Sequence, residues 1–145
     1  MVFLLDTSAY VRILRDRPYA ERAEAALRRI APLLHLSSVV RAELTQGARG
    51  TEGRALVAKL SRRLEQAGRV VVPVHQDWLR AATVQSQVWD AMPGLRQRHL
   101  LHDLLIACGA RRVGAILVTD NERDYRIIDR WLPTKRLTAA DLPAL

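Results

Sequence analysis

Short runs of β-type residues alternate along this chain with longer segments of helical periodicity, and this alternation restricts its fold more than any other feature. Five runs are predicted to be strands, the last an edge strand: Val2–Leu5, Leu33–Leu36, Val70–Val74, Ala115–Thr119 and Lys135–Thr138. Parallel strands need crossover connections of helical length, so strands that alternate with helices favour a parallel sheet covered by helices. We therefore expect an α/β fold with a mostly parallel sheet.

The helical segments between these strands carry apolar residues at a spacing of three to four positions. Thr7 and Ser8 supply a turn and a possible cap for the first helix, and Gly68 ends a later one. The predicted helical segments are Ser8–Asp16, Tyr19–Ile30, Val39–Ala48, Thr51–Gln66, Gln76–Ala91, Leu100–Arg111 and, holding a shorter helix, Asn121–Trp131.

The size and composition fit one ordinary globular unit. The chain has 145 residues, of which 49% are hydrophobic, so we expect a single domain spanning residues 1–145 with its own core. Its one cysteine, Cys108, excludes an internal disulfide. It shows no signal peptide and no apolar stretch near the roughly 20 residues that span a bilayer, which predicts a soluble, cytoplasmic protein without a membrane partner.

The net charge is +8, which favours a polyanionic partner, either nucleic acid or an acidic protein. Arginine greatly outnumbers lysine, as a GC-rich genome would also produce, so the charge alone does not decide the partner.

Several acidic residues lie where apolar residues are expected. Asp6 directly follows the apolar run VFLL, and Asp120 directly follows AILVT. Ligands of open α/β sheets bind at the carboxyl ends of the strands, so both acids are predicted to reach that edge. Asp103 lies within LLHDLLIACGA, and Glu43 lies among apolar residues near the start of its predicted helix.

Each acid has a structural interpretation when it is considered alone. Asp6, Asp103 and Asp120 could cap helices or turns, and Glu43 could be a solvated helix residue. The repeated pattern is harder to explain this way, because ionised carboxylates buried together raise each other's pKa and destabilise the fold. Mg²⁺ or Mn²⁺ binds such oxygen ligands, offsets the repulsion and activates water for phosphodiester cleavage.

Four motifs that carry these acids resemble one known family. LLDTSAYV, SSVVRAELTQGA, LHDLLIACGA and LVTDNERDY occur in this order and resemble the PIN-domain ribonucleases, above all the VapC-type toxins of toxin–antitoxin pairs. The resemblance spans residues 2 to about 142. It implies a three-layer α/β/α domain with a central sheet of four to five strands, and Mg²⁺- or Mn²⁺-dependent endonucleolytic cleavage of RNA. It also implies a homodimer and a cognate antitoxin whose tail blocks the active-site groove.

The resemblance carries over to individual residues of the first three motifs. Asp6, Glu43 and Asp103 match its three most dependable acids, with Asp6 and Asp103 as the direct metal ligands. Thr7 or Ser8 would orient the site.

The fourth motif leaves a choice between two acids. Thr119, Asn121 and Asp124 fit the family's spacing, with Tyr125 where phenylalanine is usual, while Asp120 is an additional acid at the strand end. Asp120 is favoured by its placement, and Asp124 remains the alternative.

Other residues have less specific patterns. His99 could lie on the same side of its helix as Asp103, and His102 directly precedes Asp103. Arg12, Arg41, Arg96 and Arg98 could bind RNA phosphates or simply be solvated. Trp78, Trp89 and Trp131 are most simply core or dimer-interface residues.

Two alternative functions use the same residues. The chain could be a catalytically inactive PIN module that binds RNA or protein through its arginines. It could also be an aspartyl-phosphate phosphotransferase with Asp6 as the nucleophile. Such enzymes usually need a second acid two residues further on, and Ser8 occupies that position.

Overall fold

The computed structural model describes all residues from 1 to 145 and contains one five-stranded parallel sheet. The strands are β1 (Val2–Leu5), β2 (Leu34–Ser37), β3 (Val70–Val71), β4 (Ala115–Thr119) and β5 (Arg136–Thr138). Their order across the sheet is β3-β2-β1-β4-β5, and every neighbouring pair is parallel. The predicted α/β fold with a parallel sheet is confirmed.

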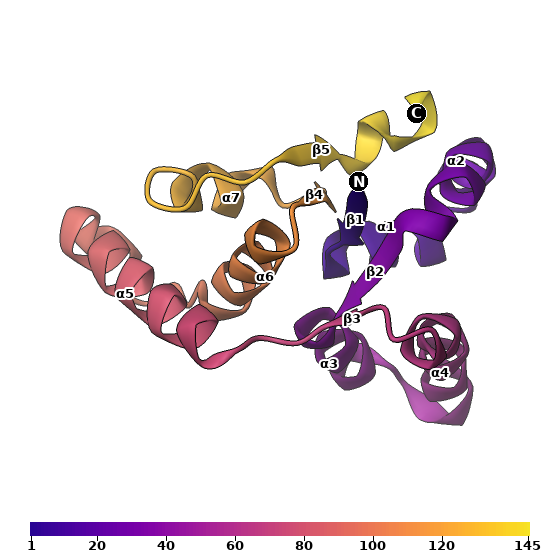
Figure 1. Cartoon of the computed structure of the whole chain (residues 1–145), viewed down its shortest axis with the longest axis horizontal. Helices are drawn as coiled ribbons and strands as arrows, with labels where there is room; N and C mark the ends of the chain where they lie inside the picture. The colour runs from indigo at the N-terminus through magenta and orange to yellow at the C-terminus, as the bar shows by residue number, and fades with distance from the viewer.

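Helices cover both faces of the sheet, with α5 and α6 on one side and α2 and α4 on the other (Figure 1). The α-helices are α1 (Thr7–Arg15), α2 (Arg17–Ile30), α3 (Ser38–Gly47), α4 (Gly50–Gln66), α5 (His75–Ala91), α6 (Leu101–Arg112) and α7 (Glu122–Ile128). Short 3₁₀ turns lie at η1 (Ala31–Leu33), η2 (Pro93–Leu95) and η3 (Ala139–Ala144). None of the helices has the length and apolarity that a bilayer crossing requires.

The central strands are buried because helices cover them on both faces. Leu4 and Leu5 of β1 and Leu117 and Val118 of β4 are at most 1% exposed. Such near-continuous apolar strands are typical of parallel sheets. The core continues into α6, where every residue from Leu104 to Ala110 is buried. This burial explains why Leu100–Arg111 reads as a strongly apolar segment.

The strand order reverses direction at β1, and this places a crevice between β1 and β4. The chain runs outward from β1 through β2 to β3, and then returns to lay β4 on the other side of β1. Leu5 pairs with Val118, and the Asp6 amide donates to the Val118 carbonyl at 3.0 Å. Asp6 and Thr119 therefore leave the sheet side by side, where open α/β sheets bind ligands.

Most predicted boundaries agree within one or two residues, and one strand is shorter than expected. β3 ends at Val71 rather than Val74. Pro73 has no amide hydrogen to donate, and the Val72 carbonyl accepts from Arg112 at 2.7 Å instead of from a strand. α7 ends at Ile128, because the Asp129 carboxylate accepts from the Thr134 amide at 3.2 Å and turns the chain toward β5.

The structure also tests the predictions for the cap of the first helix, for Gly68 and for Trp78. The cap of α1 is Asp6 rather than Thr7 or Ser8: its backbone is still extended, and its Oδ1 accepts from the Ala9 amide at 3.0 Å. Gly68 follows α4 with a φ of +67°, as expected for a glycine that ends a helix. Trp78 is 48% exposed and is therefore not a core residue.

Candidate active site at the carboxyl edge of the sheet

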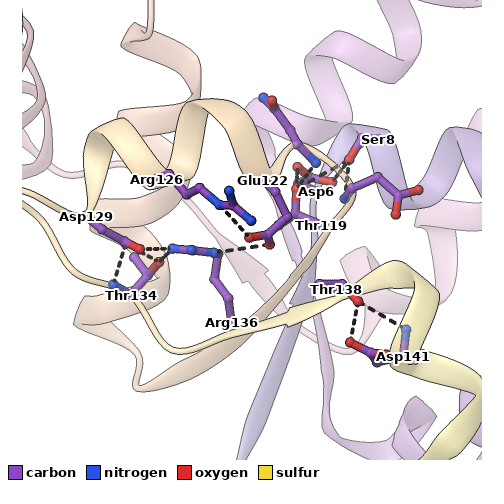
Figure 2. A network of polar contacts seen from close by, with 12 residues as sticks. Asp6, Ser8, Thr119, Glu122, Arg126, Asp129, Thr134, Arg136, Thr138 and Asp141 are labelled. Carbon is purple, nitrogen blue, oxygen red and sulfur yellow. Dashed lines mark hydrogen bonds and ion pairs between the residues drawn. The ribbon is translucent and has the colours of Figure 1, made fainter.

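Asp6 is held in one orientation by three hydrogen bonds (Figure 2). Oδ1 accepts from the Ser8 hydroxyl at 2.7 Å as well as from the Ala9 amide, and Oδ2 accepts from the Thr119 hydroxyl at 2.5 Å. The residue is only 3% exposed. Burial raises the pKa of Asp6 above its ordinary value, and these donors partly oppose the rise. Ser8 and Thr119, both predicted as supporting residues, are therefore direct partners of this acid.

Asp103 lies in the first turn of α6, where its carboxyl group is close to three other acids. Desolvation, followed by the charges of Asp124, Asp6 and Glu43, raises the pKa of Asp103 to about 7. His102 acts in the opposite direction but does not offset the other effects. The structure thus brings four carboxyl groups into one region, although they come from four distant parts of the chain.

Glu43 lies on α3, with its two carboxylate oxygens bound to different partners. Oε2 accepts a hydrogen bond from the Thr7 hydroxyl of α1, and Oε1 contacts Nδ1 of His102 at 2.9 Å. Glu43 is thereby tied to both α1 and α6, the two helices that begin beside Asp6 and Asp103. This gives Thr7, another predicted supporting residue, a defined partner.

The two candidates for the fourth acid have different environments. Asp124 is 8% exposed, and its Oδ2 accepts from the Asn121 side-chain amide at 3.1 Å. Asp120 is more exposed, and its Oδ1 pairs with the Arg12 guanidinium at 2.9 Å. Both lie near the end of β4, as expected from the sequence. Asp124 is the one whose charge acts most strongly on Asp103.

Arg136 of β5 holds α7 in place from below (Figure 2). Its guanidinium donates to Asp129 at 2.5 Å, lies 3.6 Å from Glu122 and stands 5.6 Å from the centre of the Tyr125 ring. Because these contacts reach both ends of α7, they fix the helix that carries Asp124. Tyr125 itself is fully buried.

An open pocket of about 400 Å³ is present among these acids. It is lined by Asp6, Thr7, Ser8, Val11, Glu43, Asp103, Ile106 and Asn121. A larger cavity of about 490 Å³ lies among α1, α2 and α4, but its lining is mostly apolar, with Arg63 and Arg69, and contains no acid. Of these two cavities, only the one at the carboxyl edge of the sheet is lined by acids.

Two basic residues that the sequence offered without a partner are found at this site. Arg98, considered as a phosphate ligand, forms an ion pair with Asp124, and His102, which directly precedes Asp103, contacts Glu43. The expectation for His99 was wrong: its ring packs edge-on against Trp89, with centroids 5.7 Å apart. The i, i+4 argument required a helical His99, but α6 begins only at Leu101. Arg12 and Arg41, considered as phosphate ligands, pair with Asp120 and Glu65.

The donor set suits a hard divalent cation, although it does not form a closed cage. No three His, Cys, Asp or Glu side chains converge closely enough to enclose an ion. Mg²⁺ usually binds one or two carboxylates and keeps several waters, so an open carboxylate cluster is compatible with it. Desolvation and the charges of three neighbouring acids raise the pKa of Asp103. A cation bound beside Asp103 would offset the repulsion among these charges.

The raised pKa of Asp103 predicts how the stability of the metal-free protein depends on pH. Between about pH 4 and pH 7 the folded state keeps a proton that the unfolded state releases, so stability falls as pH rises through this range. We expect a loss of about 2 kcal/mol from Asp103, after allowing for its contact with water. Urea unfolding in EDTA at pH 5 and pH 8 measures this loss. An Asp103→Asn variant with the same pH dependence as the wild type would contradict the assignment.

Together, the fold and the site define an α/β domain that gathers acids at the switch point of a parallel sheet. The chain belongs to the PIN domain family, whose model matches residues 3–130. No curated protein matches the sequence.

Solved structures with a similar fold cover almost the whole chain. VapBC-1 from nontypeable Haemophilus influenzae has a TM-score of 0.68 at 22% identity, and the match covers 97% of this chain and 99% of that one. FitAcB from Neisseria gonorrhoeae has a TM-score of 0.66 at 22% identity, with 96% and 99% covered. DNA-bound VapBC from Salmonella typhimurium has a TM-score of 0.65 at 19% identity, with 96% and 98% covered. The fold is thus shared along the full length of these chains, and the likeness extends no further than the fold.

Proposed function

We propose that this PIN domain is a metal-dependent endoribonuclease and the toxin of a toxin–antitoxin pair. The observation that carries the proposal is the open pocket lined by Asp6, Glu43 and Asp103, together with the charge of Asp124 that acts on Asp103. Like charges gathered in one place destabilise a fold, so their assembly requires a functional reason. The net charge of +8 supports a polyanionic substrate.

Asp6 and Asp103 are assigned as the direct ligands of Mg²⁺ or Mn²⁺, with Glu43 and Asp124 completing the site. When bound, the cation supplies an activated water and offsets the charge that develops on the phosphate. The remaining roles belong to side chains that orient the acids. Ser8 and Thr119 fix Asp6, Thr7 fixes Glu43 and Asn121 fixes Asp124. Such supporting hydrogen bonds typically change metal affinity or activity by about 10- to 100-fold.

Cleavage of RNA by the purified protein tests this function. We expect labelled RNA to be cut with Mg²⁺ or Mn²⁺ and left intact with EDTA. An Asp6→Asn variant that cuts as fast as the wild type would show that the proposed site is wrong. RNA binding with a steep salt dependence but without cleavage would indicate an inactive binding module instead. Turnover of a generic phosphomonoester that is lost in Asp6→Asn would indicate a phosphotransferase.

Metal binding should also stabilise the folded protein. A ligand at 100 times its Kd that binds only the folded state adds about 2.7 kcal/mol, which corresponds to a rise in Tm of roughly 5–10 °C for a domain of this size. Thermal unfolding with and without Mn²⁺ measures the rise. Asp90→Asn, an exposed acid on α5, is the matched control and should keep it. An equal rise in Asp103→Asn would count against Asp103 as a ligand.

The partner proteins are part of the same proposal. The similarity to VapBC-1 and FitAcB supports a cognate antitoxin for this chain, and we propose that it inserts into the active-site groove. We also propose a homodimer, for which the exposed Val72, which follows β3, and Trp78 and Leu79 in the first turns of α5 are candidate contacts. Co-expression with a small protein encoded directly upstream should give a complex in which RNA cleavage is blocked. Analytical ultracentrifugation of the chain alone reports its oligomeric state.

A further inference from the structure

Arg98 is the one basic side chain that pairs with Asp124, the acid whose charge acts most strongly on Asp103. Its guanidinium meets Oδ1 of Asp124, while Oδ2 is bound by Asn121. Oδ1 is buried, and the Arg98 guanidinium is the one charged group that contacts it. Release of this single contact would let Oδ1 meet another cation in its place.

The backbone that carries Arg98 is firmly anchored to α5. The Arg98 amide donates to the Leu95 carbonyl at 2.8 Å, and its carbonyl accepts from the Trp89 indole at 3.2 Å. The Leu100 amide donates to Gln85 at 2.6 Å. The backbone position from which the Arg98 side chain extends is therefore fixed. Its side chain is 31% exposed and has no other ion pair, so the guanidinium can turn toward solvent without unfolding the segment.

Two other acids of the cluster are bound by different groups. Asp6 accepts from hydroxyl and amide donors, and Glu43 is bound by Thr7 and His102. Arg12 is engaged by Asp120 outside the cluster. Arg98 is therefore the arginine placed to meet both the buried acid and an incoming phosphate, for which a guanidinium fork is well suited.

We propose that Arg98 occupies the place of a cation in the metal-free acid cluster and releases Asp124 when a divalent cation binds, after which its guanidinium binds a phosphate of the RNA. The second half rests on the proposed ribonuclease function, whereas the first concerns the acids and a cation alone. Arg98 is a competitor of the metal and an anchor of the substrate. Its removal must therefore change the two affinities in opposite directions.

Titration with Mn²⁺ in the absence of RNA tests the competition. By isothermal titration calorimetry we expect Arg98→Ala to bind Mn²⁺ roughly tenfold more tightly than the wild type, the scale of one lost charge-assisted contact. Arg98→Gln keeps most of the side chain without its charge and should also bind Mn²⁺ more tightly than the wild type. It replaces the alanine variant if that variant does not fold. Arg96→Ala is the matched control, because Arg96 is exposed and makes no ion pair. Equal affinities in the Arg96 and Arg98 variants would overturn the competition, as would weaker binding in Arg98→Ala.

Steady-state cleavage of a short RNA at saturating Mn²⁺ tests the anchoring. We expect KM to rise roughly tenfold in Arg98→Ala and to change little in Arg96→Ala, since only Arg98 gains a bound phosphate as a partner. An equal rise of KM in both variants would mean that the lost positive charge alone causes it, and this would overturn the anchoring. If the wild type cuts no RNA, the ribonuclease proposal and the anchoring both fail. The Mn²⁺ titration still decides the competition.

Discussion

Replacing Asp103 by Asn should abolish RNA cleavage while making the metal-free protein more stable at pH 8. The loss of a charged ligand at the reacting centre is expected to lower the cleavage rate by about 10²–10³-fold. The gain in stability arises because the wild-type carboxyl group, with a pKa of about 7, must ionise next to three like charges. Asparagine keeps the shape and removes that cost, about 2 kcal/mol after allowance for solvent contact.

Two measurements on the same preparation check this pair of effects. Cleavage of labelled RNA in Mn²⁺ gives the rate, and urea unfolding in EDTA gives the stability. Asp90→Asn makes the same chemical change on an exposed part of α5 and should alter neither. Destabilisation of Asp103→Asn at pH 8 would mean that Asp103 is a structural capping residue. Retained cleavage would remove it from the active site.

Replacement of Asp120 and replacement of Asp124, the two candidates for the fourth acid, should change the cleavage rate by unequal amounts. We expect Asp124→Asn to lower the cleavage rate by about 10²-fold, because Asp124 is buried and its charge acts directly on Asp103. Asp120→Asn should stay within about twofold of the wild type. The main contact that it breaks is a partly exposed ion pair with Arg12, whose typical contribution is about 0–1 kcal/mol, and the charge of Asp120 is the smallest of the effects on the pKa of Asp6.

Parallel rate measurements on both variants decide between them. Their Mn²⁺-induced rise in Tm is a second readout: the rise should shrink in Asp124→Asn and persist in Asp120→Asn. A large loss of activity in Asp120→Asn with normal activity in Asp124→Asn would reverse the assignment in favour of the residue at the strand end.

The choice between Asp120 and Asp124 shows which features of the site a sequence pattern can predict. Placement at the end of an apolar strand correctly predicted that Asp120 lies at the carboxyl edge of the sheet. The direction of its side chain depends on Arg12, which is 108 positions away in the chain. The surroundings of Asp124 likewise depend on Arg98 and on the contact of Arg136 with α7. Such long-range partners leave no periodic pattern in a sequence.

Helix boundaries limited the prediction in a similar way. His99 precedes both the predicted helix start at Leu100 and the observed start of α6 at Leu101, so the helical spacing to Asp103 does not apply to it. Its ring packs on Trp89, while His102 reaches Glu43. Polar neighbours on a helix are defined by their spacing only where the backbone is helical. Small boundary errors therefore matter most for residues at helix ends, and this site is built almost entirely from helix ends.

The sequence by itself determined the class of fold, the parallel sheet and the positions of Asp6, Glu43 and Asp103 within their segments. It could do so because strand and helix periodicity, and acids placed in apolar runs, are local properties of a chain. Only the tertiary structure decided which acids share a pocket, which basic residues neutralise them and where Asp120 points. Those outcomes depend on Coulomb and hydrogen-bond contacts between segments that become neighbours only after the sheet has formed.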